Sequence, residues 1–245
     1  LTRSNEALLH PFVDSKGNFG KQYSRDMAFA APRYTEVKLD PICSDIFGDI
    51  DKNTVDFVDN YDATMKEPTL LPTAFPNILV NPNQGIAVGM ASNIASFNLR
   101  EICEATCEYM KNPEVDLSEF IQAPDFSTGG ILLYDAEEMR KIFETGRGSF
   151  KIRSVYNYDK KNNCIEITQI PYTTTSEVII DKIIELIKGG KVREISDIRD
   201  ETDKGGLKIT IDLKRGADPD MLMTRLFRLT TLEDTFSCNF NLLID

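Results

Sequence analysis

Val178-Ile179-Ile180-Asp181-Lys182-Ile183-Ile184-Glu185-Leu186-Ile187 is the most regular stretch of the sequence, because its apolar residues recur at intervals of three and four positions. That spacing places the apolar side chains on one face of a helix. Ser176 supplies a start signal and Gly189-Gly190 a stop signal. The stretch therefore predicts an amphipathic helix that packs on a core.

Three further helices are expected. Asn98 is a potential N-cap for a helix whose apolar face runs from Leu99 to Met110 and which ends before Pro113. Another is expected from Ala136 to Glu144, with Gly146 as the stop. The last follows Asp218-Pro219, with inward-facing leucines expected at Leu222, Leu226 and Leu229.

Apolar or alternating runs bounded by turn residues lie between these helices and predict strands. These runs are 78–80, 131–133, 150–156, 164–170 and 207–213, with a last strand-like run from Phe236 to Ile244. The polar segment 158–163 suits an exposed hairpin turn. Because helices and strands alternate irregularly, without a repeated βαβ unit, we expect an α+β fold with a mixed arrangement of helices and strands.

One long segment carries no charge. From Pro68 to Leu99 no residue is charged, although charged residues make up 27% of the chain. Such a segment is either buried or faces a partner that a charge would repel. Beginning at Pro68, the same stretch also holds Pro72, Pro76 and Pro82, together with Gly85 and Gly89.

Composition narrows the classes of protein. The 245 residues are 41% apolar, which suffices for a packed core, and no apolar run reaches the roughly 18 residues of a membrane helix. The five cysteines are odd in number and form no C-x-x-C pair, which favours a reducing, cytoplasmic setting. The first residue is Leu and the last run has no terminating signal, so we expect a piece of a longer protein.

The net charge of −11 is unevenly distributed. Residues 1–35 carry five bases against three acids, and a second basic cluster comprises Arg140, Lys141, Arg147, Lys151 and Arg153. Each cluster is either a solvated face or a contact for phosphates. We interpret the acidic residues between Asp45 and Asp62 as a solvated face. A magnesium site formed by these residues is the less favoured alternative.

Several motifs for ion binding, nucleotide binding or histidine-dependent catalysis are incomplete or absent in this sequence. The segment starting at Asp49 imitates a calcium loop but has Thr54 and Asn60 where that loop needs Gly and Glu. Gly146-Arg147-Gly148 lacks the third glycine of a dinucleotide fingerprint, and no Walker A loop is present. His10 is the only histidine, which argues against a zinc site, a histidine-dependent triad or the active site of a tyrosine recombinase.

Ala30-Ala31-Pro32-Arg33-Tyr34-Thr35-Glu36 resembles the active-site signature of the A subunits of DNA gyrase and topoisomerase IV, the bacterial type IIA topoisomerases. Flanking segments resemble the same family in the same order, so the resemblance covers nearly the whole chain. They are Gly17-Asn18-Phe19-Gly20, 54–62, Pro76-Asn77, Val80-Asn81, 85–91, Gly146-Arg147-Gly148, Ile170-Pro171-Tyr172 and 199–203.

The resemblance implies that Tyr34 is a nucleophile that forms a transient 5′-phosphotyrosine bond with DNA. A tyrosine hydroxyl has a pKa of about 10 and needs help to attack at neutral pH. Arg33 is expected to hold the scissile phosphate and to stabilise the developing charge. The alternatives are a structural aromatic at Tyr34 and a surface ion pair between Arg33 and Glu36.

The resemblance also gives Ile86 the role of an apolar wedge that unstacks base pairs and kinks the duplex. The alternative from pattern alone is a core strand residue. Phosphate contacts are expected from Lys21 and Arg25 near the tyrosine and from Arg147, Lys151 and Arg153 along the flanking duplex.

The sequence departs from the family pattern in two places. Pro32 stands where Met or a small residue is expected, and proline there biases Ala31 away from the helical region. The loop from Lys21 to Asp26 is slightly longer than in the family, which affects the geometry of the segment leading to Tyr34.

In domain terms the resemblance implies that residues 1–40 are the C-terminal part of a winged-helix domain and that residues 41–245 are the tower domain. Partners would be double-stranded DNA and a B subunit that holds ATP and Mg²⁺, within an A₂B₂ holoenzyme containing an A-subunit dimer. This chain alone is expected to bind no metal and not to turn over DNA. Details of the match favour topoisomerase IV of the low-GC Gram-positive type over gyrase.

Two other classes remain open. A non-catalytic DNA-binding or scaffold module would leave Tyr34 structural, and covalent trapping on cut DNA separates the two interpretations. A single-chain tyrosine nuclease or recombinase would act without any partner.

Overall fold

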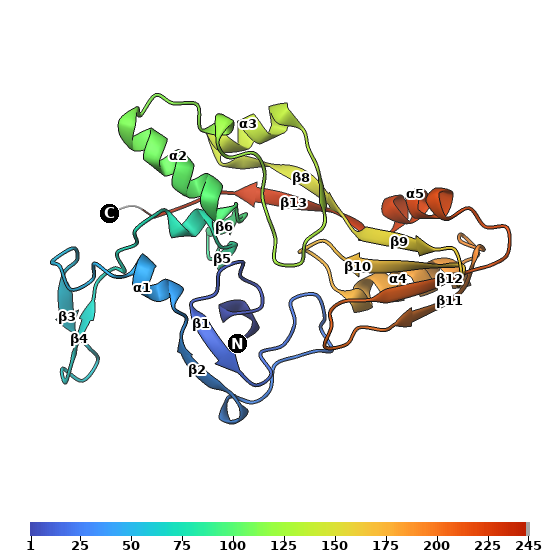
Figure 1. Ribbon diagram of the computed structural model, residues 1–245, viewed down its shortest axis with the longest axis horizontal. Coiled ribbons are helices and arrows are strands. Elements are labelled where there is room, and N and C mark those ends of the chain that lie inside the picture. The colour runs from blue at the N-terminus through green and yellow to red at the C-terminus, as the bar shows by residue number, and fades with distance from the viewer. Residues whose placement is uncertain (244–245) are drawn as a thin grey trace.

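A five-stranded antiparallel sheet forms the centre of the structure, a computed structural model that describes residues 1–243 (Figure 1). Its strand order is β5 (Asn83–Ala87), β6 (Met90–Ile94), β13 (Glu233–Asn239), β8 (Arg147–Arg153) and β7 (Ile131–Leu133). Helices α2 (Leu99–Lys111) and α3 (Ala136–Thr145) pack on one face of this sheet. Their buried side chains join Phe150, Ile152 and Phe236 in one hydrophobic core.

A four-stranded antiparallel sheet forms a second core. Its order is β11 (Ile195–Asp200), β12 (Ile209–Leu213), β10 (Cys164–Gln169) and β9 (Val155–Asp159). Helices α4 (Ser176–Lys188) and α5 (Pro219–Leu229) contribute Ile179, Ile183, Leu222 and Leu226 to this core. Strand β8 runs into β9 across the buried Ser154, so the two sheets are joined directly.

The N-terminal third is built from short elements (Figure 1). Strands β1 (Val13–Lys16) and β2 (Glu36–Leu39) form an antiparallel pair, and the 3₁₀ turns η1 (Thr2–Ser4) and η2 (Pro32–Tyr34) flank them. Helix α1 (Ile42–Ile46) leads to an isolated hairpin of β3 (Phe57–Asp59) and β4 (Lys66–Pro68). Two further 3₁₀ turns follow, η3 (Asn77–Leu79) and η4 (Leu117–Glu119).

The four expected helices are confirmed, and side chains cap the N-termini of three of them, whereas Thr175 precedes α4 without a side-chain cap and Ser176 is its first residue. The side chain of Asn98 accepts hydrogen bonds from the N–H groups of Arg100 and Glu101, and Asp218 caps α5 in the same way. Gly146 ends α3 in the left-handed conformation at φ +67°. The inward position expected for Leu229 is wrong, because this side chain lies exposed at the end of α5.

The strand predictions are confirmed in part. Segment 131–133 is a strand as expected, and 164–170 and 207–213 hold the slightly shorter β10 and β12. The run 78–80 is wrong, because a 3₁₀ turn follows Pro76 there. The last run is β13, which ends at Asn239, and Ile244 lies outside the described residues. Every strand pair within residues 1–243 is antiparallel, in agreement with the α+β class.

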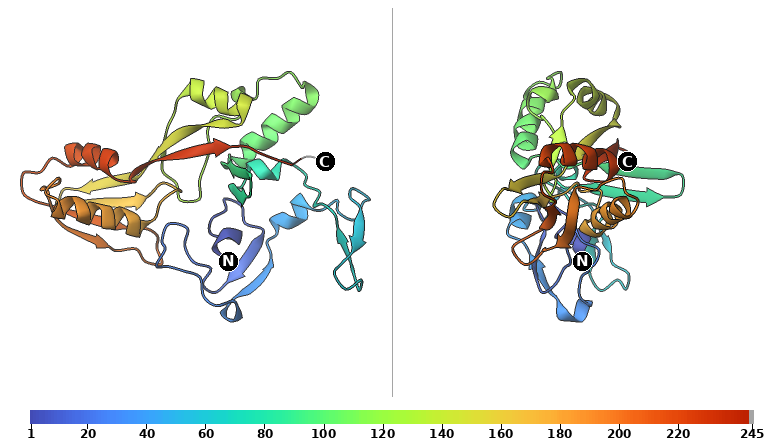
Figure 2. Two further views of the ribbon diagram at one scale, coloured as in Figure 1. Left: turned by 180° about the vertical axis from the view of Figure 1, so that it is seen from behind. Right: turned by 90° about the vertical axis from the view of Figure 1, so that its right-hand side faces the viewer.

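Hairpin β5–β6 projects from the body of the molecule, as the right-hand view of Figure 2 shows. It lies in the middle of the uncharged segment, whose residues from Asn83 to Ala91 are mostly exposed, whereas Val80, Asn81 and residues 94–97 are buried. No helix within residues 1–243 combines the length and the apolar character that crossing a bilayer requires.

Candidate active site

Tyr34 lies at the end of the η2 turn with its side chain 66% exposed. Its N–H donates to the carbonyl of Ala31 at 2.9 Å, and the Thr35 hydroxyl donates to the carbonyl of Pro32 at 2.8 Å. Ala31 has φ −59° and ψ 143°, an extended conformation that confirms the expected effect of the following proline. The turn therefore presents the tyrosine hydroxyl to solvent, without a side-chain hydrogen-bond partner in residues 1–243.

The guanidinium group of Arg33 lies beside the aromatic ring of Tyr34. Its guanidinium carbon is 4.8 Å from the centroid of the Tyr34 ring, within the range of a cation–π contact. No carboxylate in the described part of the chain forms an ion pair with Arg33, and the expected alternative, a pair with Glu36, is not formed. An arginine without a carboxylate partner keeps its planar donors available for an anion.

The Gly17-Asn18-Phe19-Gly20 segment packs closely against the turn that carries Tyr34. A Cβ atom at Gly17, which has φ +95°, would lie 2.7 Å from the carbonyl oxygen of Tyr34. Phe19 is 3% exposed, and the Asn18 carbonyl accepts the N–H of Ala30 at 2.9 Å. Glycine is required at position 17 because the two backbones touch there.

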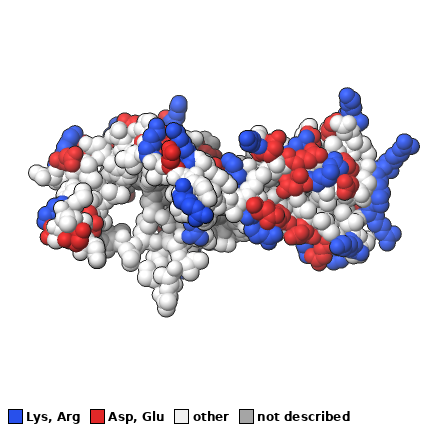
Figure 3. All heavy atoms as spheres, turned by 90° about the horizontal axis from the view of Figure 1, so that it is seen from below, with Lys and Arg blue, Asp and Glu red and all other residues white. Residues whose placement is uncertain are grey.

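Ile86 lies near the tip of the projecting hairpin and is 85% exposed, so its alternative interpretation as a core strand residue is wrong. Its neighbour Val88 is fully exposed as well. No residue from Asn83 to Ile94 is charged, and Figure 3 shows the hairpin as an uncharged projection, whereas charged side chains gather over the four-stranded sheet. The tip of the hairpin therefore presents apolar side chains to solvent.

Strand register places Ile86 and the basic residues of β8 on the same face of the five-stranded sheet. Gln84 pairs with Asn93, Asn93 with Asn239, and Asn239 with Arg147, so these four side chains share one face. Every second residue of a strand faces the same side, which adds Ile86, Lys151 and Arg153 to this face. The opposite face carries Phe150 and Ile152 and is covered by α2 and α3.

The face with Ile86, Arg147, Lys151 and Arg153, opposite the one covered by α2 and α3, is called the open face below. Glycines place Arg147 on this open face. Gly146 turns the chain out of α3, and a Cβ at Gly148 would lie 2.6 Å from Ile142 Cγ1 and 2.7 Å from a carboxylate oxygen of Glu138. Gly148 thus allows the close approach of α3 and β8. Between Arg147 and Arg153 the strand extends about 20 Å, from a rise of about 3.4 Å per residue.

The residues expected to bind phosphates differ in whether a carboxylate already forms an ion pair with them. Lys151 and Arg153 both pair with Glu233, at 3.0 and 2.5 Å, and Lys21 pairs with Glu6 at 3.1 Å. Arg25 has a loose contact of 3.7 Å with the adjacent Asp26. Arg147 is exposed and forms no ion pair with any side chain of residues 1–243.

Glu233 was not singled out by the sequence, because a lone acid on a strand carries no local signal. Burial alone would raise the pKa of its carboxyl group, but the hydrogen bonds from Arg153 and Lys151 outweigh burial and leave the pKa below its usual value. Glu233 is thus an anion held between two bases of the open face.

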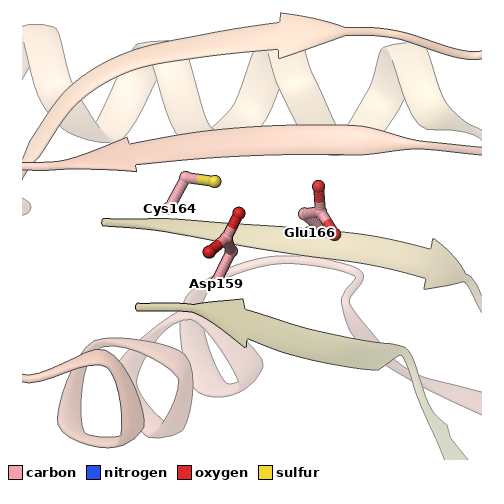
Figure 4. A group of neighbouring side chains, drawn as sticks. All are labelled: Asp159, Cys164 and Glu166. Carbon is pink, nitrogen blue, oxygen red and sulfur yellow. The ribbon is translucent and has the colours of Figure 1, made fainter. Parts of the chain in front are cut away.

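One group of three potential metal ligands occurs in residues 1–243, namely Asp159, Cys164 and Glu166 on the β9–β10 hairpin (Figure 4). Asp159 already accepts hydrogen bonds from Lys161 N–H and Asn162 Nδ2, and Glu166 pairs with Lys208 at 2.8 Å. Mg²⁺ prefers oxygen ligands, and the third group here is a buried thiol. The group does not fit magnesium, and the acids between Asp45 and Asp62 form no such cluster in the part of the chain that the structure describes.

The structure contains an exposed tyrosine beside an arginine that has no carboxylate partner among residues 1–243. It also contains a projecting apolar hairpin and a basic strand that share one face of a sheet. These features involve the residues that carry the family resemblance of the sequence. The family model for the A subunit of DNA gyrase/topoisomerase IV matches residues 3–245. The chain therefore belongs to this family.

Curated relatives are named as the A subunit of DNA gyrase. The chain is 43% identical to that of Metamycoplasma arthritidis (strain 158L3-1), over 98% of this chain and 27% of the relative. It is 44% identical to that of Ureaplasma parvum serovar 3, over 95% and 28%, and 41% identical to the chloroplastic/mitochondrial protein of Arabidopsis thaliana, over 95% and 25%. The chain spans about a quarter of the length of these relatives, and their names give no support to the expected preference for topoisomerase IV.

Proposed function

We propose that this chain is the DNA-cleaving part of the A subunit of a type IIA topoisomerase, and that Tyr34 is its nucleophile. The observation that carries this proposal is the exposed Tyr34 hydroxyl beside Arg33, whose guanidinium has no carboxylate partner within residues 1–243. A structural tyrosine would instead be packed or hydrogen-bonded.

In the proposed reaction the Tyr34 oxygen attacks a backbone phosphorus atom of DNA. The new bond joins the tyrosine oxygen to the phosphorus, and the bond from phosphorus to the 3′ oxygen breaks. The proton lost by tyrosine is balanced by the proton gained by the 3′ hydroxyl. Because one phosphoester replaces another, the strand can be resealed by the reverse step.

Arg33 would act electrostatically in this step. Its fork can bind two phosphate oxygens and stabilise the charge that builds on them, and a cation next to the ring favours phenolate character in the attacking oxygen. The contact with the Tyr34 ring holds the guanidinium near the reacting oxygen before DNA arrives. The role assigned to Arg33 is thus electrostatic and is not that of a general base.

The open sheet face would carry the duplex on either side of the cut. Ile86 would insert between base pairs at a cost of a few kcal/mol, which contacts along the face offset. Arg147 is available for a phosphate, whereas Lys151 and Arg153 must first leave Glu233. Lys21 would similarly have to exchange Glu6 for a phosphate, and the exposed Arg25 side chain is held only loosely by Asp26.

The remaining assignments follow from family membership. Residues 1–40 would complete a winged-helix domain and residues 41–245 would form the tower domain. A partner B subunit would supply the ATP site and the Mg²⁺ site. Two copies of each subunit would pass one duplex through a break in another.

Covalent trapping tests the proposal. The full-length subunit is mixed with its B partner, Mg²⁺ and duplex DNA labelled at its 3′ ends, then denatured rapidly. We expect label joined to protein in the wild type and in Tyr61→Phe, a control at a second exposed tyrosine, and none in Tyr34→Phe. DNA binding without any adduct would favour the scaffold module, and cleavage without the B subunit would favour a single-chain nuclease.

A further inference from the structure

The loop from Lys21 to Asp26 reaches from the N-terminal part of the chain to the start of α4 (Figure 1). This is the loop that is slightly longer than the family pattern. One carboxylate oxygen of Glu177 accepts the Ser24 hydroxyl at 2.5 Å and the N–H of Asp26 at 3.0 Å, and the other accepts the N–H of Arg25 at 3.0 Å. Three donors of one short loop thus converge on a single side chain.

A second contact fixes the same loop. The N–H of Ser176 donates to the carbonyl of Tyr23 at 2.8 Å, and the Tyr23 ring packs against the core of the four-stranded sheet. Ser24 is 8% exposed. Burial alone would raise the pKa of Glu177, but the three hydrogen bonds outweigh it and lower the pKa to about 2, so the carboxylate stays ionised at physiological pH.

The loop is connected tightly to the tyrosine turn. The N–H of Lys21 donates to the carbonyl of Met27 at 3.0 Å, which closes the base of the loop. The Asn18 side chain donates to the carbonyl of Ala28 at 3.0 Å, and its backbone carbonyl accepts the N–H of Ala30. These contacts link the loop through residues 27–30 to the turn that begins at Pro32.

Helix α4 is fixed on its other side to the DNA-facing part of the molecule. Its buried residues Ile179 and Ile183 pack in the core that contains β9 and β10. Strand β9 continues from β8, which carries Arg147, Lys151 and Arg153. The Glu177 contact therefore connects the element that bears the nucleophile with the sheet that would hold the duplex.

We propose that Glu177 is a positioning residue for Tyr34, acting through the Lys21–Asp26 loop to fix the tyrosine turn relative to the open face of the five-stranded sheet. The proposal rests on the proposed function for its consequence in catalysis. Its structural part, the coupling of Glu177 to residues 27–34, stands on the contacts alone.

Hydrogen exchange tests the coupling without any activity. Amide exchange across residues 21–34 is measured by mass spectrometry in the full-length subunit, for the wild type, Glu177→Gln and the control Glu185→Gln. Glu185 lies on the same helix and forms a surface ion pair with Lys182, so its change alters the charge equally. We expect faster exchange at residues 24–34 in Glu177→Gln alone; equal exchange in all three proteins would overturn the proposal.

Covalent trapping with the B partner tests the consequence. In Glu177→Gln we expect the covalent complex to fall on the order of 10-fold at saturating DNA, with DNA affinity unchanged, because misplacement of a nucleophile lowers the rate and not the binding. Unchanged trapping despite faster exchange would refute a positioning role. Absence of an adduct in the wild type would refute the proposed function instead, and the exchange result would still decide the coupling.

A milder variant covers the case in which Glu177→Gln does not fold. Ser24→Ala removes one of the three donors and leaves both backbone N–H groups on the carboxylate. We expect a smaller change of the same kind in both measurements. Wild-type behaviour of a folded Ser24→Ala in both would contradict the proposal in that case.

Discussion

Neutralising Glu233 should strengthen DNA binding in a salt-dependent way. Glu233 holds Lys151 and Arg153 on the open sheet face, and its side chain is only 12% exposed. In Glu233→Gln the carboxylate that competes with a DNA phosphate for these two bases is gone. Both side chains remain on the outward face of β8, because the register that places them there is set by the backbone.

The size of the effect follows from the number of bases released. Each phosphate contact adds about 0.9 to the slope of log affinity against log salt. Two released bases would therefore steepen that slope by up to about 1.8. Over a rise in salt from about 50 to about 200 mM, the variant would lose about 10-fold more affinity than the wild type.

Fluorescence anisotropy with a labelled duplex, titrated at several salt concentrations, measures this slope for the full-length subunit. Glu185→Gln serves as the control, because it removes the same charge from a surface pair on α4. Thermal unfolding of each variant reports whether the fold is retained. If the slopes of Glu233→Gln and Glu185→Gln are equal, Glu233 does not keep Lys151 and Arg153 from DNA phosphates, and this prediction is wrong.

Three further predictions concern the acid range, the tyrosine turn and the hairpin. Because folding lowers the pKa of Glu177 from 4.5 to about 2, its contribution is present above about pH 4.5 and is lost as the pH falls towards 2; urea unfolding should show up to about 3 kcal/mol of such loss in the wild type and not in Glu177→Gln. Gly17→Ala should strain the backbone of the proposed nucleophile by roughly 1–3 kcal/mol and reduce covalent trapping, whereas Gly206→Ala, at another positive φ but with open space around it, should leave trapping unchanged. Ile86→Ala should reduce DNA bending, measured by energy transfer between labelled duplex ends, more than Val88→Ala does, with neither change altering stability by more than about 0.5 kcal/mol because both side chains are exposed.

The helices could be predicted from sequence because their signals are local. Periodicity, Asn98 and Asp218 as N-caps, and Gly146 as a stop all act within a few residues of the element they define. The hairpin β5–β6 escaped prediction, since Asn83 to Ile94 shows no alternation of apolar and polar residues. Both faces of a projecting hairpin meet solvent or a partner, so the usual strand pattern is absent.

The arrangement of the site could not be read from local patterns. Ile86 and Arg147 share a face only because β13, at residues 233–239, is inserted between their strands. The same insertion brings Glu233 against Lys151 and Arg153. The identities of Tyr34, Arg33 and Ile86 came from the resemblance, and the structure adds which of the basic residues are already paired.

Locating the covalent bond tests the central claim most directly. The trapped adduct is digested with nuclease and trypsin, and mass spectrometry identifies the peptide that retains a nucleotide. Tyr34 lies in the peptide from Tyr34 to Lys38, whereas the other exposed tyrosines, Tyr61, Tyr109 and Tyr134, lie in different peptides. A nucleotide on the Tyr34 peptide is the predicted result, and a nucleotide on any other tyrosine peptide would contradict the assignment of Tyr34 as the nucleophile.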